Sequence, residues 1–134
     1  MYYSYLRRYI PEEKMQMFYG DSKESSELIM SRAESGQCTV TLATYSKATE
    51  GTNVKAWEVG FLVSSISSDK NIKQCIGRIL RKKEGKLNPV RLYDYQFSDV
   101  YSYRKHFEAR MKVYKEFKFP ISGDIKGYKR RLNV

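Results

Sequence analysis

The sequence lacks the features that mark membrane-spanning, secreted and metal-binding proteins. Its longest apolar runs are only a few residues, well short of the roughly 18 that a membrane-spanning helix needs. Residues 1–10 contain no apolar core of a signal peptide, and the single histidine, His106, cannot by itself build a His/Cys metal cluster. These absences favour an intracellular protein that is not secreted and does not span a membrane.

Cysteine is also scarce, and its two copies lie far apart in the chain. Cys38 and Cys75 each sit within an apolar run. This pattern favours two buried, reduced thiols in an intracellular protein over a disulfide or a pair of metal ligands.

Positive charge is what the chain has in excess, and all of that excess lies in its second half. The formal net charge is +10. Residues 1–69 hold 7 Lys and Arg against 9 Asp and Glu, whereas residues 70–134 hold 18 against 6. Such a distribution predicts a polyanionic partner, either nucleic acid or an acidic membrane surface.

Apolar and polar residues follow one another in repeated strand–helix units. Short apolar, β-branched or alternating runs predict strands at residues 14–19, 38–44, 57–63 and 90–95. Helical spacing predicts helices at residues 21–34, 69–82 and 99–117. Asp21 or Ser22 would cap the first, with Leu28, Ile29 and Ala33 on one face and Gly36 as its stop. The last has one stripe at helical spacing, made of Val100, Tyr103, Phe107, Met111 and Tyr114. The expected fold class is therefore α/β, with a mainly parallel sheet flanked by helices on both faces. We expect one domain over residues 1–118 and a basic tail over residues 119–134.

The helix expected at residues 69–82 carries two different stripes. The apolar stripe, which we expect to be buried, consists of Ile72, Cys75, Ile76, Ile79 and Leu80. The opposite stripe consists of Gln74, Gly77, Arg78 and Arg81. Two guanidiniums and an amide in one line suit the negative oxygens of a phosphate that is being transferred. A glycine in mid-helix costs roughly 1 kcal/mol relative to alanine and suggests a close approach there. The competing interpretation is a solvated basic helix face.

A polar segment follows the strand expected at residues 38–44. Open α/β sheets bind their ligands at this carboxyl edge. Thr44 and Ser46 offer hydroxyls to a sugar–phosphate backbone, Gly51 permits close backbone approach, and Asn53 offers an amide to a ribose or phosphate. Taken alone, the segment could equally be an ordinary polar turn.

Together the two segments resemble motifs V and VI of superfamily 2 nucleic-acid helicases. Ala43-Thr44 is followed after six residues by Gly51-x-Asn53, and then, after about twenty residues, by Gln74-x-x-Gly-Arg78-x-x-Arg81. The chain is most similar in pattern to the phage and large-DNA-virus helicases of that superfamily. The matching stretches are Phe18–Lys23, Thr41–Asn53, Gln74–Arg81 and Leu92–Asp94, within a resemblance over about residues 15–118.

The resemblance implies the second RecA-like domain of an ATP-dependent helicase or translocase, without its first strand. Arg78 and Arg81 would be arginine fingers that reach the γ-phosphate of an ATP bound on a partner RecA domain. Gln74 would help to link that phosphate to the interface. Gly51 and Asn53 would lie on its ribose and γ-phosphate side, although many relatives have aspartate where Asn53 stands. A viral enzyme of this kind would work in a host cytoplasm, a nucleus or a virus factory.

The resemblance also implies a nucleic-acid track. Thr44 would contact the nucleic-acid backbone, together with Ser46 and Lys47, and we expect Arg104 and Lys105 to add further contacts. The gap of six residues between Thr44 and Gly51 is one longer than in the DEAD-box RNA enzymes, which favours DNA over RNA as the partner.

A phosphate-gripping loop is missing from the sequence. No G-x-x-x-x-G-K-[ST] motif and no acidic magnesium box is present, and Gly85-Lys86 has no glycine-rich lead-in. ATP and Mg²⁺ would therefore be held mainly by an N-terminal RecA-like domain from a split gene or a second chain. We expect no ATP hydrolysis by this chain alone. The alternative function is a non-enzymatic, basic nucleic-acid-binding remnant of a helicase, and a membrane-surface protein is a distant third.

Overall fold

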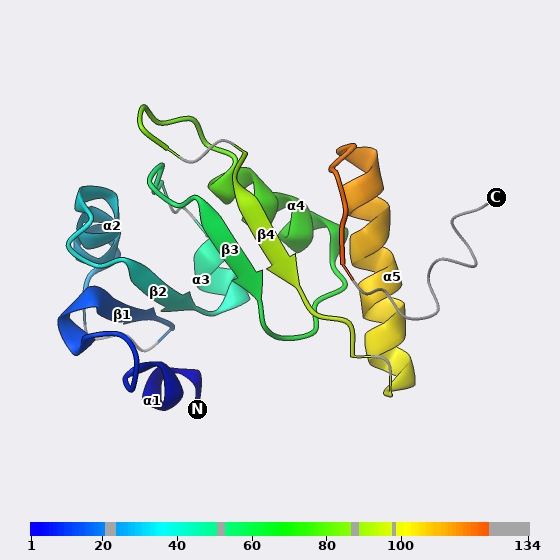
Figure 1. Ribbon diagram of the computed structural model, residues 1–134, viewed down its shortest axis with the longest axis horizontal. Coiled ribbons are helices and arrows are strands. Elements are labelled where there is room, and N and C mark those ends of the chain that lie inside the picture. The colour runs from blue at the N-terminus through cyan, green and yellow to red at the C-terminus, as the bar shows by residue number, and fades with distance from the viewer. Residues whose placement is uncertain (21–23, 51–52, 87–88, 98, 124–134) are drawn as a thin grey trace. The chain divides into compact units, whose positions relative to one another are not determined.

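The computed structural model describes residues 1–20, 24–50, 53–86, 89–97 and 99–123 (Figure 1). The chain divides into two compact units. The first unit contains residues 1–60 and 74–91, and the second contains residues 61–73 and 92–134. No helix within the described ranges is both long enough and apolar enough to cross a membrane.

The first unit is organised around a parallel strand–helix–strand motif. Strand β1 (Met15–Phe18) pairs in parallel with β2 (Val40–Ala43), with Met15 opposite Val40 and Phe18 opposite Ala43. Helix α2 (Ser26–Ser35) connects the two strands. Its N-cap is Ser25, whose Oγ accepts a hydrogen bond from the amide of Leu28 at 3.2 Å. The caps expected at Asp21 or Ser22 lie outside the described residues.

Helix α2 ends as the sequence predicts, but one residue of its expected buried face is exposed. Gly36 adopts a left-handed conformation with φ 78°, which glycine reaches without steric cost. Ile29 and Ala33 are buried as predicted. Leu28 is 43% exposed, so its assignment to the buried face was wrong. It precedes Ile29 by one residue and therefore lies about 100° around the helix from it, away from the side on which Ile29 and Ala33 are buried.

The buried face of the β1–β2 pair carries one buried polar residue. Gln16 is buried in β1, and its Nε2 donates to the carbonyl of Ile29 at 2.8 Å and to Oγ1 of Thr41 at 3.0 Å. These bonds tie both strands to α2. β2 itself is only half-buried, in contrast to the buried central strand that its composition predicts. The reason is that β2 pairs with a single strand, β1, among the residues that the structure describes.

A second strand pair consists of β3 (Val59–Leu62) and β4 (Arg91–Asp94). Their arrows point the same way in Figure 1. All four predicted strands are therefore present, each shorter than its sequence pattern suggests. The α/β class and the parallel pairing are confirmed. The single sheet that the pattern predicts is replaced, over the described ranges, by two separate two-stranded sheets.

Helix α4 (Asp69–Ile79) stops three residues before the predicted end at Lys82. Ile72, Cys75 and Ile76 are buried as predicted. Leu80 lies beyond the last helical turn and is 42% exposed, so its predicted burial was wrong. Cys38 is also buried, which confirms the predicted placement of both thiols.

Helix α5 (Tyr101–Glu116) matches the long helix expected after β4. Phe107, Met111 and Tyr114 are buried as predicted. Val100 and Tyr103 are exposed, because Val100 is the N-cap and Tyr103 lies in the first turn, ahead of the buried part of the helix. Three short elements were not predicted from the sequence: α1 (Tyr2–Leu6), the 3-10 turn η1 (Glu12–Lys14) and α3 (Tyr45–Thr49).

Candidate functional site

The polar segment after β2 begins with a short helix, α3, instead of an open turn. Thr44 is the N-cap of α3, and its amide donates to the carbonyl of Phe18, the last residue of β1, at 3.1 Å. The segment therefore starts at the carboxyl edge of the β1–β2 pair, as the sequence predicts. The hydroxyls of Thr44 and Ser46 are 3.5 Å apart and exposed. The Nζ of Lys47 lies 5.7 Å from the centroid of the Phe18 ring.

Thr49 closes α3 and leaves one backbone acceptor available to another element. Its buried hydroxyl donates to the carbonyls of Tyr45 and Ser46, at 2.9 and 3.0 Å. These bonds to carbonyls three and four residues earlier satisfy the Thr49 hydroxyl within its own helix. The carbonyl of Thr49 accepts a hydrogen bond from Nη2 of Arg78 at 2.9 Å.

Arg81 makes the second contact between the two segments. Its Nη1 donates to Oδ1 of Asn53 at 2.5 Å. The amide of Asn53 in turn contacts Sδ of Met30 in α2 at 3.3 Å. Both arginines singled out in the sequence thus reach residues 49–53. Gly51 lies outside the described residues.

The two guanidiniums place positive charge close to the end of α4. Burial, and then the charge of Arg81, lower the pKa of Arg78 from its ordinary value. Arginine nonetheless stays charged in proteins at neutral pH. Two cations that raise each other's energy favour an anion beside them, and a phosphate group matches the geometry of their planar forks.

Other members of the α4 stripe are only partly engaged with the chain. Gln74 is half-buried, one helical turn before Arg78. Gly77 is exposed, and a Cβ added there would meet nothing within 4 Å. The described chain therefore does not itself provide the close approach that a mid-helix glycine suggested. Burial raises the pKa of the Cys75 thiol on the opposite side, which keeps it protonated and a poor nucleophile.

Lys86 supports the end of α4, a role that the sequence did not predict. Its Nζ donates to the carbonyl of Ile79 at 2.5 Å and to that of Arg81 at 2.7 Å. A cation is favourable at a helix C-terminus, where carbonyls have no helical partner. Burial lowers the pKa of Lys86. The only signal in the sequence was Gly85-Lys86, in which Gly85 turns the chain with φ 74°.

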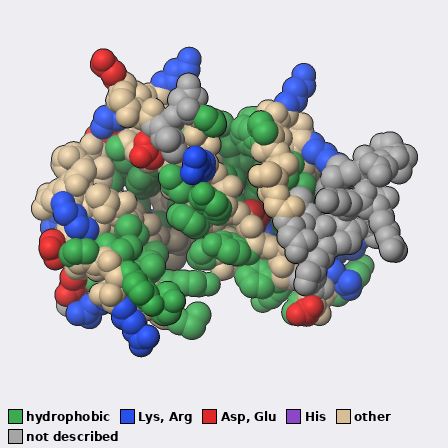
Figure 2. All heavy atoms as spheres, in the orientation of Figure 1, with side chains coloured by type: hydrophobic (Ala, Val, Ile, Leu, Met, Phe, Trp, Pro, Cys, Tyr) green, Lys and Arg blue, Asp and Glu red, His purple; other side chains and the backbone are tan. Residues whose placement is uncertain are grey.

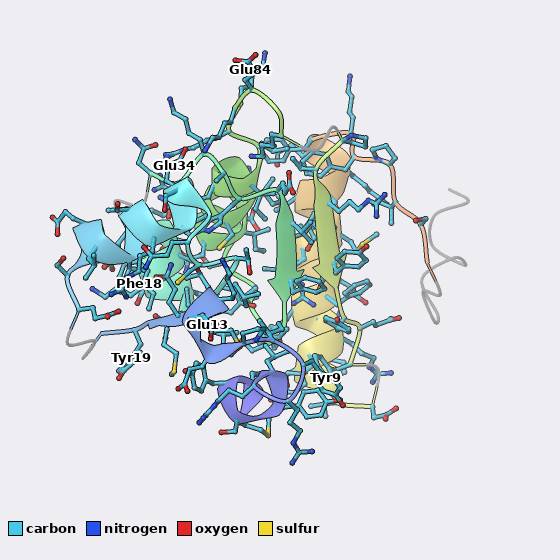
Figure 3. All side chains as sticks on the ribbon, turned by 60° about the vertical axis from the view of Figure 1, so that its left-hand side comes forward. Tyr9, Glu13, Phe18, Tyr19, Glu34 and Glu84 are labelled. Carbon is cyan, nitrogen blue, oxygen red and sulfur yellow. The ribbon has the colours of Figure 1, made fainter. Side chains whose placement is uncertain are left out.

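Glu34 lies near the end of α2 (Figure 3). Its carboxylate accepts hydrogen bonds from residues that follow Asn53 and Arg81 closely in the chain. Its Oε2 accepts from the amides of Lys55 and Ala56, at 2.7 and 3.1 Å. Its Oε1 accepts from Nζ of Lys83 at 2.8 Å. The bond from Lys83, followed by those from the two amides, lowers the pKa of Glu34. No sequence spacing could have revealed this carboxylate, because its partners lie 21, 22 and 49 residues away.

Arg104 and Lys105, the remaining predicted contacts to nucleic acid, belong to the second unit. Both are exposed near the start of α5, and their charges lie 5.6 and 5.7 Å from the centroid of the Tyr101 ring. Lys105 also pairs with Glu108 at 3.2 Å. They form a cationic surface of the second unit.

The chain matches no protein-family model and no curated protein. Over the described ranges, no group of three or more His, Cys, Asp or Glu side chains could hold a metal ion.

Proposed function

We propose that this chain is the second RecA-like half of a superfamily 2 helicase or translocase that acts on DNA. The observation that carries the proposal is the double contact of Arg78 with Thr49 and of Arg81 with Asn53. Two segments that each allow an ordinary interpretation, a polar turn and a basic helix face, meet through the residues that the helicase pattern singles out.

In this proposal Arg78 and Arg81 act on the phosphates of ATP. An N-terminal RecA-like domain would supply the phosphate loop and the Mg²⁺ ligands. In this chain each guanidinium donates to a neutral carbonyl or amide oxygen. Phosphate oxygens are stronger acceptors, because hydrogen bonds between charged groups are roughly twice as strong as neutral ones. The arginines would then exchange their partners and stabilise the charge that develops at the γ-phosphate.

The same exchange would couple ATP to nucleic acid. Release of Thr49 and Asn53 by the arginines frees the segment that begins with the exposed hydroxyls of Thr44 and Ser46 and the cation of Lys47. Hydroxyls and a lysine of this kind suit a sugar–phosphate backbone. Each arginine would thus bond alternately to the ATP phosphates and to the segment that contacts nucleic acid. This alternation is a physical route by which ATP hydrolysis moves the nucleic-acid strand.

The test supplies the chain with an N-terminal RecA-like helicase domain in trans and measures DNA-dependent ATP hydrolysis. Arg81→Ala should lower kcat by roughly 10³-fold or more, which is typical of an arginine finger. Arg81→Lys should recover little, since a point charge cannot reproduce the planar fork. Lys82→Ala is the matched control, because it removes the adjacent exposed cation and should leave kcat unchanged. Near-normal turnover in both Arg78→Ala and Arg81→Ala would refute the proposal.

The alternative function, a basic nucleic-acid-binding remnant, gives Arg78 a purely structural role. Under this alternative, Arg78→Ala lowers the free energy of unfolding by removing the bond to Thr49, and no N-terminal half confers hydrolysis. Binding of DNA together with a complete lack of ATP turnover in the reconstituted pair would favour it.

A further inference from the structure

Exposed aromatic rings lie on one face of the β3–β4 pair, within the second unit. Side chains alternate between the two faces of a strand. Leu62 of β3 is 7% exposed and the side chain of Asp94 in β4 is 11% exposed. Their neighbours Phe61 and Tyr93 are 57% and 44% exposed. The pair therefore has one covered face and one open face.

Helix α5 covers the first of these faces. Nε of Arg110 donates to Oδ2 of Asp94 at 2.8 Å, and the hydroxyl of Tyr114 donates to the same oxygen at 2.7 Å. These bonds hold the covered side of β4 against α5. Phe61 and Tyr93 consequently point away from the core of the unit.

The rings on the open face lie flat against each other. The Phe61 and Tyr93 centroids are 4.9 Å apart, and the two ring planes differ by 11°. Tyr95, the first residue after β4, is 46% exposed. Figure 2 shows hydrophobic side chains gathered over β3 and β4 on the side toward the viewer. We call Phe61, Tyr93 and Tyr95 the aromatic face.

The second unit also carries positive charge at the start of α5. Arg104 and Lys105 lie beside the Tyr101 ring, which is 67% exposed. The described residues of the unit, 61–73, 92–97 and 99–123, hold 8 Lys and Arg against 5 Asp and Glu. An apolar protein partner would be complementary to the aromatic face alone. A polyanion with flat groups that can stack is complementary to both the aromatic face and the positive charge.

We propose that the aromatic face stacks the bases of single-stranded nucleic acid, while Arg104 and Lys105 contact its phosphates. Every base has a flat π surface, so aromatic side chains bind single strands with little dependence on sequence. Phe61 and Tyr93 are already parallel, which reduces the ordering needed when a base extends the stack. A duplex buries its base faces and binds this surface more weakly than a single strand.

This site does not depend on the helicase proposal, since it involves neither Arg78 nor Arg81 and needs no ATP. The two proposals can therefore fail separately. A chain that binds single strands through the aromatic face, yet gives its arginines no part in hydrolysis, would support one proposal and refute the other.

The experiment measures fluorescence anisotropy of a labelled oligothymidylate with the full chain at several salt concentrations. The oligonucleotide should exceed the roughly 4–16 nucleotides of a typical single-strand site. Phe61→Leu combined with Tyr93→Leu keeps the apolar area but removes both rings, and should weaken binding about 5- to 100-fold. The salt dependence should not change, because no phosphate contact is lost. Lys105→Ala should instead reduce the slope of log affinity against log salt by about 0.7.

Two controls separate stacking from other causes. Tyr93→Phe keeps the ring and should bind as the wild type does. Tyr5 and Tyr9 form another exposed aromatic pair, with centroids 5.5 Å apart in the first unit, and their replacement by leucine should leave affinity unchanged.

Several outcomes would overturn the proposal. Wild-type affinity in the Phe61→Leu/Tyr93→Leu variant is one, and an equal loss of affinity in the Tyr5/Tyr9 control is another. Unchanged DNA binding together with an altered oligomeric state in light scattering would assign the face to a protein partner. Photocrosslinking of the wild-type chain to a bromouridine-substituted oligonucleotide does not depend on any variant. Crosslinks at Phe61, Tyr93 or Tyr95 support the proposal, and crosslinks found only elsewhere refute it.

Discussion

Arg110 is 2% exposed and donates through Nε to the carboxylate of Asp94, 2.8 Å away, in the second unit of the chain. Its other nitrogens donate to the backbone carbonyls of Ile66 and Tyr95, at 2.9 and 3.3 Å. One guanidinium thus joins α5, the end of β4 and the loop after β3. A buried charge is tolerated only when its bonds are satisfied, as they are here.

Replacement of Arg110 should destabilise the second unit severely. Arg110→Met leaves the carboxylate of Asp94 buried without its cation, and loss of one partner of a buried pair costs about 3–5 kcal/mol. Urea denaturation followed by circular dichroism would measure this. Lys112→Met, an exposed neighbour on the same helix, should change the free energy of unfolding by less than about 0.5 kcal/mol. A cost below about 1 kcal/mol for Arg110→Met would show that the network contributes little to stability.

Tyr114 makes stability depend on pH at the alkaline end. Burial, and then the charge of Asp94, raise the pKa of its hydroxyl above the ordinary value of 10.0. Above that ordinary pKa the unfolded chain loses the proton while the folded chain keeps it. Stability contributed by this group is therefore complete below pH 10 and falls as pH rises, by up to about 1.4 kcal/mol per pH unit. Chemical denaturation from pH 8 to 11 should show this fall, and Tyr114→Phe should reduce it. An unchanged pH profile in Tyr114→Phe would contradict the assignment.

Local patterns in the sequence predicted the strands and helices of this fold better than the way in which they pack together. The strand expected around Met15 and the spacing of Ile72, Cys75 and Ile76 depend on neighbours in the chain, and both appear in the structure. The Arg110 network joins residues 15, 16 and 44 positions apart, and no local pattern encodes it. The burial of Leu80 failed for a similar reason, since periodicity alone could not show that α4 stops at Ile79.

The candidate site was predicted in part for a different reason. Arg78, Arg81 and Asn53 were singled out by a pattern of residue types at fixed spacing. The structure pairs Arg81 with Asn53, whereas Arg78 donates to the backbone of Thr49. Their supports, Lys86 and Glu34, bond to backbone carbonyls and amides, respectively. Backbone donors and acceptors leave no trace in residue identity, so these supports became visible only in three dimensions.

Glu34 should protect the backbone amides that follow Asn53 from hydrogen exchange. Glu34→Gln weakens the bonds that Lys55 and Ala56 donate to the carboxylate, so hydrogen exchange at these two amides should speed up. The folded pKa of Glu34 lies below its ordinary value. The protection is accordingly present above the ordinary pKa of a glutamate and is lost as pH falls through the lower, folded value. Nuclear magnetic resonance would follow both amides. Glu84→Gln, in the exposed turn labelled in Figure 3, is the matched control and should change neither.

Gly77 offers a test in which stability and function should move in opposite directions. It is exposed in the interior of α4, and a Cβ there would meet no atom within 4 Å. Gly77→Ala should therefore stabilise the chain by about 0.5–1 kcal/mol, because glycine loses more backbone entropy in a helix than alanine does. Thermal unfolding would measure that gain.

If Arg78 and Arg81 bring phosphate to this side of α4, the methyl group added at Gly77 crowds the approach. The reconstituted enzyme should then hydrolyse ATP more slowly although it is more stable. Lys73→Ala, one turn before Gly77 on the same helix, adds no methyl group at Gly77 and should leave turnover unaffected. A Gly77→Ala variant with higher stability and full turnover would show that no ligand comes close to the helix at this point, and the basic stripe of α4 would then be an ordinary solvated helix face.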